Sequence, residues 1–336
     1  GEQLAALPPR KVVYAAASEF KPDAGHKPPP GPRTVHLLKR GDIHQPGAIA
    51  RPGTLGCVDG LPSRFTAAET GNESARREAL AAWISDPANP LTYRSIVNRI
   101  WQHHFGRGIV ETPSDFGRMG ASPSHPELLD WLAAWFLEDG GSIKRLHRLI
   151  VTSAGYRQST RHDARAAEID ADNRLLWRAN RRRLDAESVH DAILAASGKL
   201  DATMGGPSVR QFGLSPGVHV TPVVDYTKYD WDQPGSGRRS VYRFLFRTLP
   251  DPFMDNLDEA DASQLTAVRN ESVTPLQALA MLHNPFVIKQ SEHLADRLSR
   301  PAATDADRIR RAYALLFGRP PTDDEVQEMV DFANRQ

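Results

Sequence analysis

The spacing of hydrophobic residues along the chain changes at about residue 71. Before that point, short apolar runs at 11–17 and 34–40 alternate with Pro- and Gly-rich breaks, which is typical of strands and turns. After it, apolar residues recur every three or four positions, as on one face of a helix. We therefore predict a strand-and-turn segment over 1–70, the end of an upstream domain or a linker, and a mainly helical domain over 71–336.

The first half of the helical domain contains four stretches with an apolar stripe. They cover residues 73–86, 89–106, 125–141 and 142–159. In the second stretch the stripe passes through Val97, Trp101 and His104, and Gly106 is the kind of residue that ends a helix. Ser142 is the expected N-cap of the fourth. This half is therefore predicted to be helical, with a loop over 107–124 between the second and third stretches.

The second half mixes helices with loops. Asp185 and Gly198 are the expected cap and end of one helix. A β hairpin or strand is predicted near 239–248, from its rough alternation of apolar residues. Helices follow over 274–334, where Pro285 is expected to break the first in two. The predicted fold is mainly α with a minor β part.

Composition excludes several classes of protein. Lys and Arg total 42 against 41 Asp and Glu, so a net charge of +1 argues against a nucleic-acid partner. The single cysteine, Cys57, cannot form an internal disulfide, and no Cys-x-x-Cys-His attaches a covalent haem. The sequence shows no signal peptide and predicts no transmembrane segment, because no stretch approaches 18 apolar residues. The chain opens in the middle of a pattern, as a piece of a longer protein would.

Six segments, in order, resemble one known family. They are NPLTYRSIVNRIWQHHFGRGIVETPSDFGRMGASPSHPELLDWLA, IKRLHRLIVTSAGYRQST, NRLLWRANRRRLDAESVHDAIL, GGPSV, RRSVYRF and TPLQALAMLHNPF. Together they resemble the C-terminal domain of unknown function of planctomycete cytochrome c-associated proteins, the planctomycete-specific PSD domain family. The resemblance covers roughly residues 33–336.

The resemblance implies a setting and no reaction. Proteins of that family carry an export signal, a c-type cytochrome domain and another uncharacterised domain ahead of this one. This implies an extracytoplasmic location, periplasmic or at the cell surface, and a c-type cytochrome domain as a partner. The chain departs from the family at two points: SQLTAVRNES lacks the Cys that members often have there, and His283 stands where Asn is usual. A mechanism built on that Cys is therefore not expected.

The adjacent pair His103 and His104 raises the question of metal binding. Neighbouring helical residues point about 100° apart, so both cannot ligate one metal from a regular helix. One of the two could instead join His125 or His147 at a metal, or contact a partner or ligand. Alternatively, His104 could pack on the apolar stripe with a ring nitrogen on a backbone carbonyl. His103 would then complement the helix dipole.

The loop that follows holds further acid–base candidates. Asp115 and Arg118 lie three residues apart, and either pair locally or form the wall of a polar pocket with His125. A histidine near a carboxylate is the minimum for general acid–base catalysis. An enzyme would require His104, Asp115 and His125 in one cleft, whereas a non-catalytic module would leave them as caps and ion pairs.

Three groups in the second half are candidate ligand sites. Arg181 and Arg182 suit an anionic glycan or partner, or pair with nearby acids. Tyr229 and Trp231 could form a sugar-stacking platform, or tuck into the core. A final group of carboxylates could hold Ca²⁺, although it lacks the EF-hand spacing. Its members are Asp255, Asp258, Glu259 and Asp261, of which the three aspartates are the metal candidates.

These observations favour a structural, interaction or polysaccharide-binding module of a larger extracytoplasmic, cytochrome c-associated protein. The alternative is a carbohydrate-active hydrolase or lyase that uses Asp and His acid–base groups or a bound metal. A third hypothesis is a domain that shapes electron transfer to the family's cytochrome. The cofactor, if any, is left open by the sequence.

Overall fold

The computed structural model describes residues 34–66, 73–217, 222–247, 249–299 and 304–335. Of these residues, 45% are helical and 7% are in strands, which confirms the prediction of a mainly α fold with a minor β part. The chain forms two compact units, residues 1–180 and 181–336. The strand predicted at 11–17 lies outside the described residues. The predicted division at residue 71 stays a prediction.

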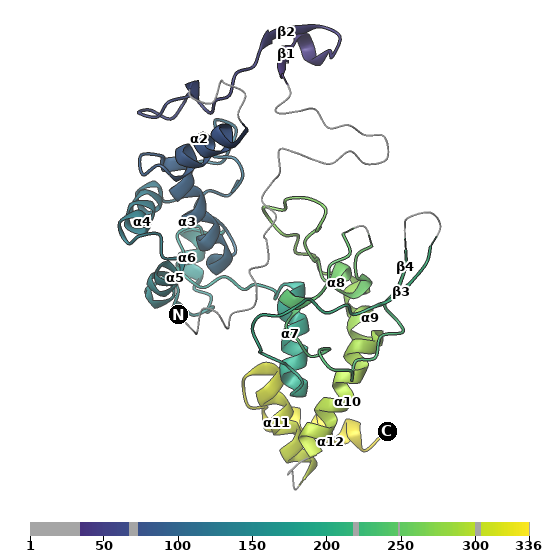
Figure 1. The fold of residues 1–336 in the computed structure, drawn as a ribbon. Helices are drawn as coiled ribbons and strands as arrows, with labels where there is room; N and C mark the ends of the chain where they lie inside the picture. The colour runs from purple at the N-terminus through teal and green to yellow at the C-terminus, as the bar shows by residue number, and fades with distance from the viewer. Residues whose placement is uncertain (1–33, 67–72, 218–221, 248, 300–303, 336) are drawn as a thin grey trace, which may run out of the picture. The chain divides into compact units, whose positions relative to one another are not determined.

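Unit 1, as described, contains one hairpin and five helices (Figure 1). Its elements are β1 (His36–Leu38), β2 (Pro46–Ile49), α2 (Glu73–Ser85), α3 (Pro90–Phe105), α4 (Pro126–Glu138), α5 (Ile143–Thr152) and α6 (Ala164–Ile169). The predicted helix ends are confirmed at two positions. Gly106 ends α3 with φ 83°, in the left-handed region that favours glycine, and the Ser142 side chain accepts from the Arg145 backbone N–H at the start of α5.

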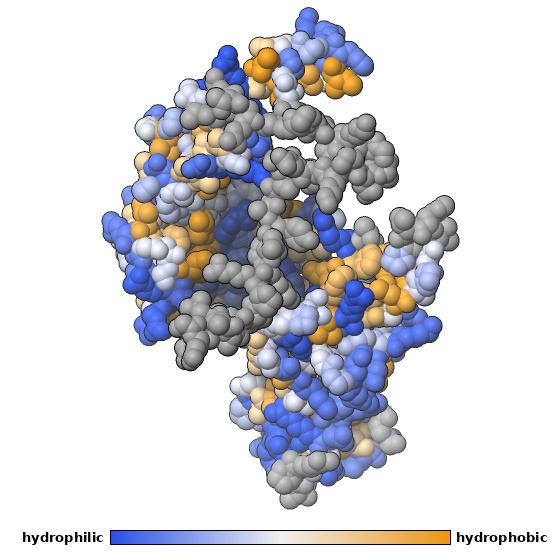
Figure 2. All heavy atoms as spheres, viewed as in Figure 1, coloured by the Kyte–Doolittle hydropathy of each residue, from blue (hydrophilic) through white to orange (hydrophobic). Residues whose placement is uncertain are grey.

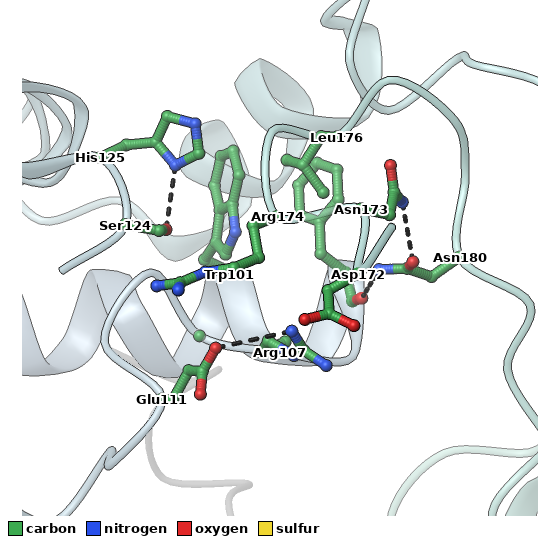
Figure 3. Close-up of a pocket in the computed structure, with 12 residues that line it drawn as sticks. Trp101, Arg107, Glu111, Ser124, His125, Asp172, Asn173, Arg174, Leu176 and Asn180 are labelled. Carbon is green, nitrogen blue, oxygen red and sulfur yellow. Dashed lines mark hydrogen bonds and ion pairs between the residues drawn. The ribbon is translucent and has the colours of Figure 1, made fainter. Parts of the chain in front are cut away.

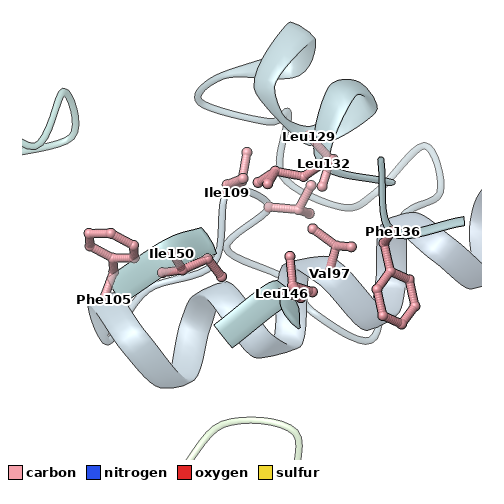
Figure 4. Packing of buried hydrophobic residues seen from close by; sticks show 9 residues of the cluster. Val97, Phe105, Ile109, Leu129, Leu132, Phe136, Leu146 and Ile150 are labelled. Atoms are coloured by element: carbon pink, nitrogen blue, oxygen red, sulfur yellow. The ribbon is translucent and has the colours of Figure 1, made fainter. Parts of the chain in front are cut away.

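The core of unit 1 is formed by α3, α4, α5 and the loop after α3 (Figure 4). Its nine buried members are Val97, Phe105, Ile109, Val110, Leu129, Leu132, Phe136, Leu146 and Ile150. The predicted stripes of α3, α4 and α5 supply seven of them, because only the two loop residues Ile109 and Val110 come from outside those helices. The apolar periodicity of these helices therefore encodes the packing of this unit.

A buried amide attaches the loop after α3 to the helix itself. Asn98 is fully buried, its Oδ1 accepts from the Val110 N–H at 2.8 Å, and its Nδ2 donates to the Val110 carbonyl at 3.0 Å. Gly108 is required beside this pair, since a Cβ there would lie 2.5 Å from the Val110 oxygen. One side chain thus satisfies both backbone groups of a buried loop residue.

Unit 2 contains six helices and a second hairpin in its described part. Its elements are α7 (Ala186–Ser197), β3 (Gly213–Ser215), β4 (Val223–Asp225), α8 (Pro252–Asn256), α9 (Pro275–His283), α10 (Pro285–Ser299), α11 (Asp305–Phe317) and α12 (Asp323–Ala333). Asp185 caps α7 and Gly198 ends it with φ 80°, both as predicted. Pro285 separates α9 from α10, which confirms the predicted break.

The strand expected near 239–248 is wrong in position. The residues form a short 3-10 turn, Ser240–Tyr242, and then a single bridge between Val209 and Arg243. The hairpin lies earlier, where β3 pairs with β4. Polarity explains the difference, because Ser240 and Arg243 are buried while Val241 is 70% exposed, the reverse of an amphipathic strand.

A second core cluster holds unit 2 together. Ala186 and Leu194 of α7 pack with Phe253, Met254, Leu257 and Phe286. In Figure 2, hydrophobic residues gather on the visible face over α8 and α9, whereas most of the visible surface of α10 to α12 is hydrophilic. Part of the hydrophobic surface belongs to α9, where Leu276, Leu279 and Leu282 are all exposed.

Candidate functional site

His104 pairs with another histidine. Its Nε2 lies 2.6 Å from Nδ1 of His147 on α5, and the ring of Tyr156 stands edge-on to it at 5.4 Å. One of the two nitrogens must donate and the other accept, so one N–H lies between the two rings. This contact joins α3 to α5. The structure thus places His147 beside His104 as a direct hydrogen-bond partner, and the metal and ligand alternatives stay predictions.

His125 lines a small cavity of unit 1 (Figure 3). Its Nδ1 lies 2.9 Å from the Ser124 hydroxyl, and an ion pair of 3.5 Å between Arg107 and Glu111 lines another side. The space is about 30 Å³, roughly one water molecule. Neither His104 nor Asp115 lines this cavity. The three acid–base candidates therefore do not share it.

Asp115 and Arg118 are both exposed in the loop between α3 and α4. The Asp115 carboxylate accepts from the Gly117 backbone N–H at 2.8 Å, and its carbonyl accepts from the Thr112 hydroxyl at 2.7 Å. These bonds order a tight turn. The observed role of Asp115 is thus to shape its own loop, and the side chain of Arg118 is left at the surface.

The acidic candidates for a cation site each make different contacts. Asp258 accepts from Arg183 at 2.5 Å and from the backbone and hydroxyl of Ser272. Partial burial raises its pKa, but these hydrogen bonds and the guanidinium outweigh it and lower the pKa. Asp261 caps a turn at Ser263, and Asp255 is exposed. Among the described residues, no three His, Cys, Asp or Glu side chains are grouped so as to hold a metal.

The remaining predicted ligand residues have different surroundings. Arg181 and Arg182 are exposed, while their neighbour Arg183 is the one that reaches Asp258. The rings of Tyr229 and Trp231 meet edge to face with centroids 4.7 Å apart, and Trp231 also contacts Phe286 of the core at 4.7 Å. Trp231 is therefore mainly a packing residue, although it also lines two cavities of unit 2.

A third cavity of unit 2, of about 300 Å³, lies around Arg243. The Arg243 side chain is only 4% exposed, and it binds the carboxylates of Asp251 and Glu259 and the amide oxygen of Gln211. The rings of Tyr226, Phe244 and Phe246 also line the space, together with Arg247 and the carboxylates of Asp255 and Asp261. We name it the Arg243 cavity.

The side chains that line the Arg243 cavity differ in their pKa shifts and in the groups that bind them. Burial raises the pKa of Glu259, although the Arg243 guanidinium opposes this. Burial, reinforced by the negative charge of Asp251, raises the pKa of Tyr226 to about 12. Asp251 is bound directly by Arg243 and also accepts from the Phe253 backbone N–H at 2.9 Å. A carboxyl whose pKa is raised thus shares one guanidinium with a second carboxyl group.

Sequence reasoning did not identify Arg243 or Asp251, and it considered Glu259 only as a member of the acidic group that could hold Ca²⁺. RRSVYRF is one of the six segments that resemble the family, but no chemistry was predicted for its arginines. The available signal was an arginine inside an apolar run, with VY before it and FLF after it, followed within 16 residues by four acids that include Asp251 and Glu259. Such an arginine is expected to be buried with partners.

Comparison with known proteins assigns a family. A family model described as PSD1, protein of unknown function (DUF1553), matches residues 76–333, which is more than half of the chain and reaches into both units. The chain belongs to this family. The match confirms the resemblance to the PSD domain. Comparisons of this PSD1 chain with curated proteins and with solved structures gave no match. In the described part of the PSD1 chain, no helix is both long and apolar enough to cross a membrane.

Proposed function

We propose that this chain is a carbohydrate-binding module and that the Arg243 cavity is its ligand site. The observation that carries the proposal is the combination of aromatic walls with charged groups around 300 Å³ of space. That volume lies at the lower end of the roughly 300–1,000 Å³ typical of ligand sites. Aromatic faces stack on the C–H face of a sugar ring, while carboxylates and guanidinium groups bind its hydroxyls.

Binding to a panel of soluble oligosaccharides, measured by isothermal titration calorimetry, tests this proposal. Asp255 is an exposed carboxylate on the cavity wall, so Asp255→Asn should weaken binding at least tenfold with little effect on folding. Asp324→Asn, an exposed change on α12, is the matched control and should bind as the parent does. Failure of the whole panel to bind, or equal weakening by both variants, would contradict the proposal.

A second candidate is a carbohydrate-active hydrolase or lyase at the same cavity. The raised pKa of Glu259 favours it, because a buried carboxyl beside a charged one is the usual pairing of general acid and base. In a hydrolase, Glu259 would donate its proton to the departing glycosidic oxygen. The Asp251 carboxylate, held by Arg243, would activate the water that attacks the sugar carbon.

Product analysis separates binding from catalysis. Any oligosaccharide that binds is incubated with the protein and examined by mass spectrometry for cleavage. Glu259→Gln keeps the shape and the contact with Arg243 but carries no transferable proton, so it should bind sugar and lose cleavage. Intact sugar after long incubation with the parent protein would leave the binding module and reject the enzyme.

The extracytoplasmic setting and the c-type cytochrome partner rest on the family resemblance alone. We propose both on that basis. Pull-down of the cytochrome domain of a full-length family protein by this chain tests the partnership. Absence of binding at micromolar concentrations of both components would reject a direct contact.

A further inference from the structure

A buried histidine in unit 2 has one ring nitrogen without a partner. His190 on α7 is 1% exposed, and its ring stacks on Phe286 with centroids 4.5 Å apart and planes 8° apart. Its Nδ1 lies 2.9 Å from the Ser240 hydroxyl oxygen and 3.3 Å from the Asp191 carboxylate. Its Nε2 is buried and has no hydrogen-bond partner among the described residues.

The contacts of Ser240 define which nitrogen carries the proton. The Ser240 hydroxyl donates to the Glu187 carbonyl at 3.2 Å, so its oxygen is left to accept. Asp191 is an acceptor as well. Nδ1 is therefore the N–H donor, and Nε2 carries the lone pair. Burial lowers the pKa of His190, which keeps the ring neutral.

His190 lines a cavity of about 120 Å³. Its apolar walls are Trp231, Pro252, Phe253, Pro285 and Phe286. An apolar cavity of about 150 Å³ binds benzene, so this space is close to the size of one aromatic ring. Asp251 also lines it, and a negative carboxylate disfavours an anionic ligand.

We propose that this cavity binds a small neutral aromatic alcohol, whose hydroxyl donates a hydrogen bond to Nε2 of His190. The aromatic walls hold the ring, and the lone pair of the histidine selects the hydroxyl. Such a ligand supplies the partner that this buried acceptor lacks. The cavity shares Tyr226 and Asp251 with the Arg243 cavity but uses a different acceptor, so this inference goes beyond the proposed function.

Titration of the full chain with phenol, benzene and benzoate tests the inference. The chain carries ¹⁵N-labelled histidine, and the Nε2 resonance of His190 is followed by NMR. Phenol should shift this resonance and bind at least tenfold more tightly than benzene, while benzoate should not bind. Equal affinity for phenol and benzene, or phenol binding without a shift at His190, would overturn the proposal.

A variant distinguishes the contribution of the Nε2 acceptor to binding from that of the apolar cavity walls. His190→Phe keeps an aromatic ring on Phe286 and removes the lone pair, so it should bind phenol and benzene equally. His44→Phe, an exposed change in unit 1, should keep the preference for phenol. If His190→Phe does not fold, the ¹⁵N shift in the parent protein decides alone. Sugar binding to Asp255→Asn is independent of these results, so the two proposals can fail separately.

Discussion

The two units solve the problem of burying a core in different ways. Unit 1 packs nine hydrophobic residues around α3, α4 and α5, and the space beside His125 is only about 30 Å³. Unit 2 buries six hydrophobic residues in its cluster together with Arg243, His190 and Gln290, and encloses cavities of about 300, 210 and 120 Å³. Buried polar groups keep the walls of a cavity apart, whereas a purely apolar core packs until little space is left. Room for a ligand therefore accompanies the polar interior.

Removing the charge at the centre of unit 2 should have the largest effect. Arg243→Met leaves Asp251 and Glu259 buried without their common partner, which costs about 4 kcal/mol of the free energy of unfolding. Urea unfolding followed by ¹⁹F NMR of labelled tryptophan measures this, since Trp231 alone of the six tryptophans lies in unit 2. Arg239→Met, at a half-exposed ion pair with Asp191, should cost less than about 1 kcal/mol. Equal costs would mean that the burial of Arg243 is irrelevant.

Creating a cavity in the core of unit 1 should cause the second-largest loss of stability. Leu146→Ala removes a fully buried side chain from a filled core and should cost about 3 kcal/mol. The same experiment, read at the five tryptophans of unit 1, measures it. Ile143→Ala on the same helix is 52% exposed and should cost under about 1 kcal/mol. A small cost for Leu146→Ala would show that this core is not closely packed.

Acid should weaken unit 2 through His190. Its pKa is lowered by burial and by the positive charge of Arg243, against the opposing effects of Asp191 and Asp251. The unfolded chain then binds the proton more readily, so the stabilising contribution is complete above about pH 6.5 and is lost as pH falls toward the lowered pKa. The slope should reach at most about 1.4 kcal/mol per pH unit.

Unfolding of unit 2 at pH 7.5 and 5.5 measures this loss, and His190→Phe should remove it. Glu259 has the opposite sign, because its raised pKa makes stability fall as pH rises from about 4.5 through the folded value. The comparison is therefore made in the Glu259→Gln background. An unchanged slope in the His190→Phe variant would assign the acid effect to another group.

The smallest effect is expected at the surface of unit 1. Arg94 and Asp130 join α3 to α4 at 2.6 Å, but their side chains are 37% and 54% exposed. A double-mutant cycle with Arg94→Ala and Asp130→Ala should give a coupling of about 0.5 kcal/mol. A coupling comparable to the cost of Arg243→Met would erase the distinction between buried and exposed pairs.

The sequence predicts what depends on neighbours along the chain. Gly106, Ser142, Asp185, Gly198 and Pro285 define helix ends through local backbone chemistry, and all are found at such ends. The prediction of a strand near 239–248 is wrong because Ser240 and Arg243 are buried against partners far away in the sequence.

The candidate site depends on such distant contacts. Arg243 meets Gln211 from 32 residues away, and Ser240 meets His190 from 50 residues away. Apolar periodicity carries no information about these pairs, because it records burial and not the identity of a partner. The histidines of α3 are conspicuous in the sequence because they are adjacent, whereas the contacts of Arg243 and His190 become visible only in the folded chain.

The amide of Asn98 makes a loop residue behave like part of a sheet. Both backbone groups of Val110 are engaged by one fully buried side chain, although Val110 lies in no helix or strand. Its N–H should therefore exchange with deuterated solvent as slowly as those in the middle of α3, and only global unfolding of unit 1 should release it. A peptide map of exchange would then show a protected island within a loop, and that island would mark where the unit opens last.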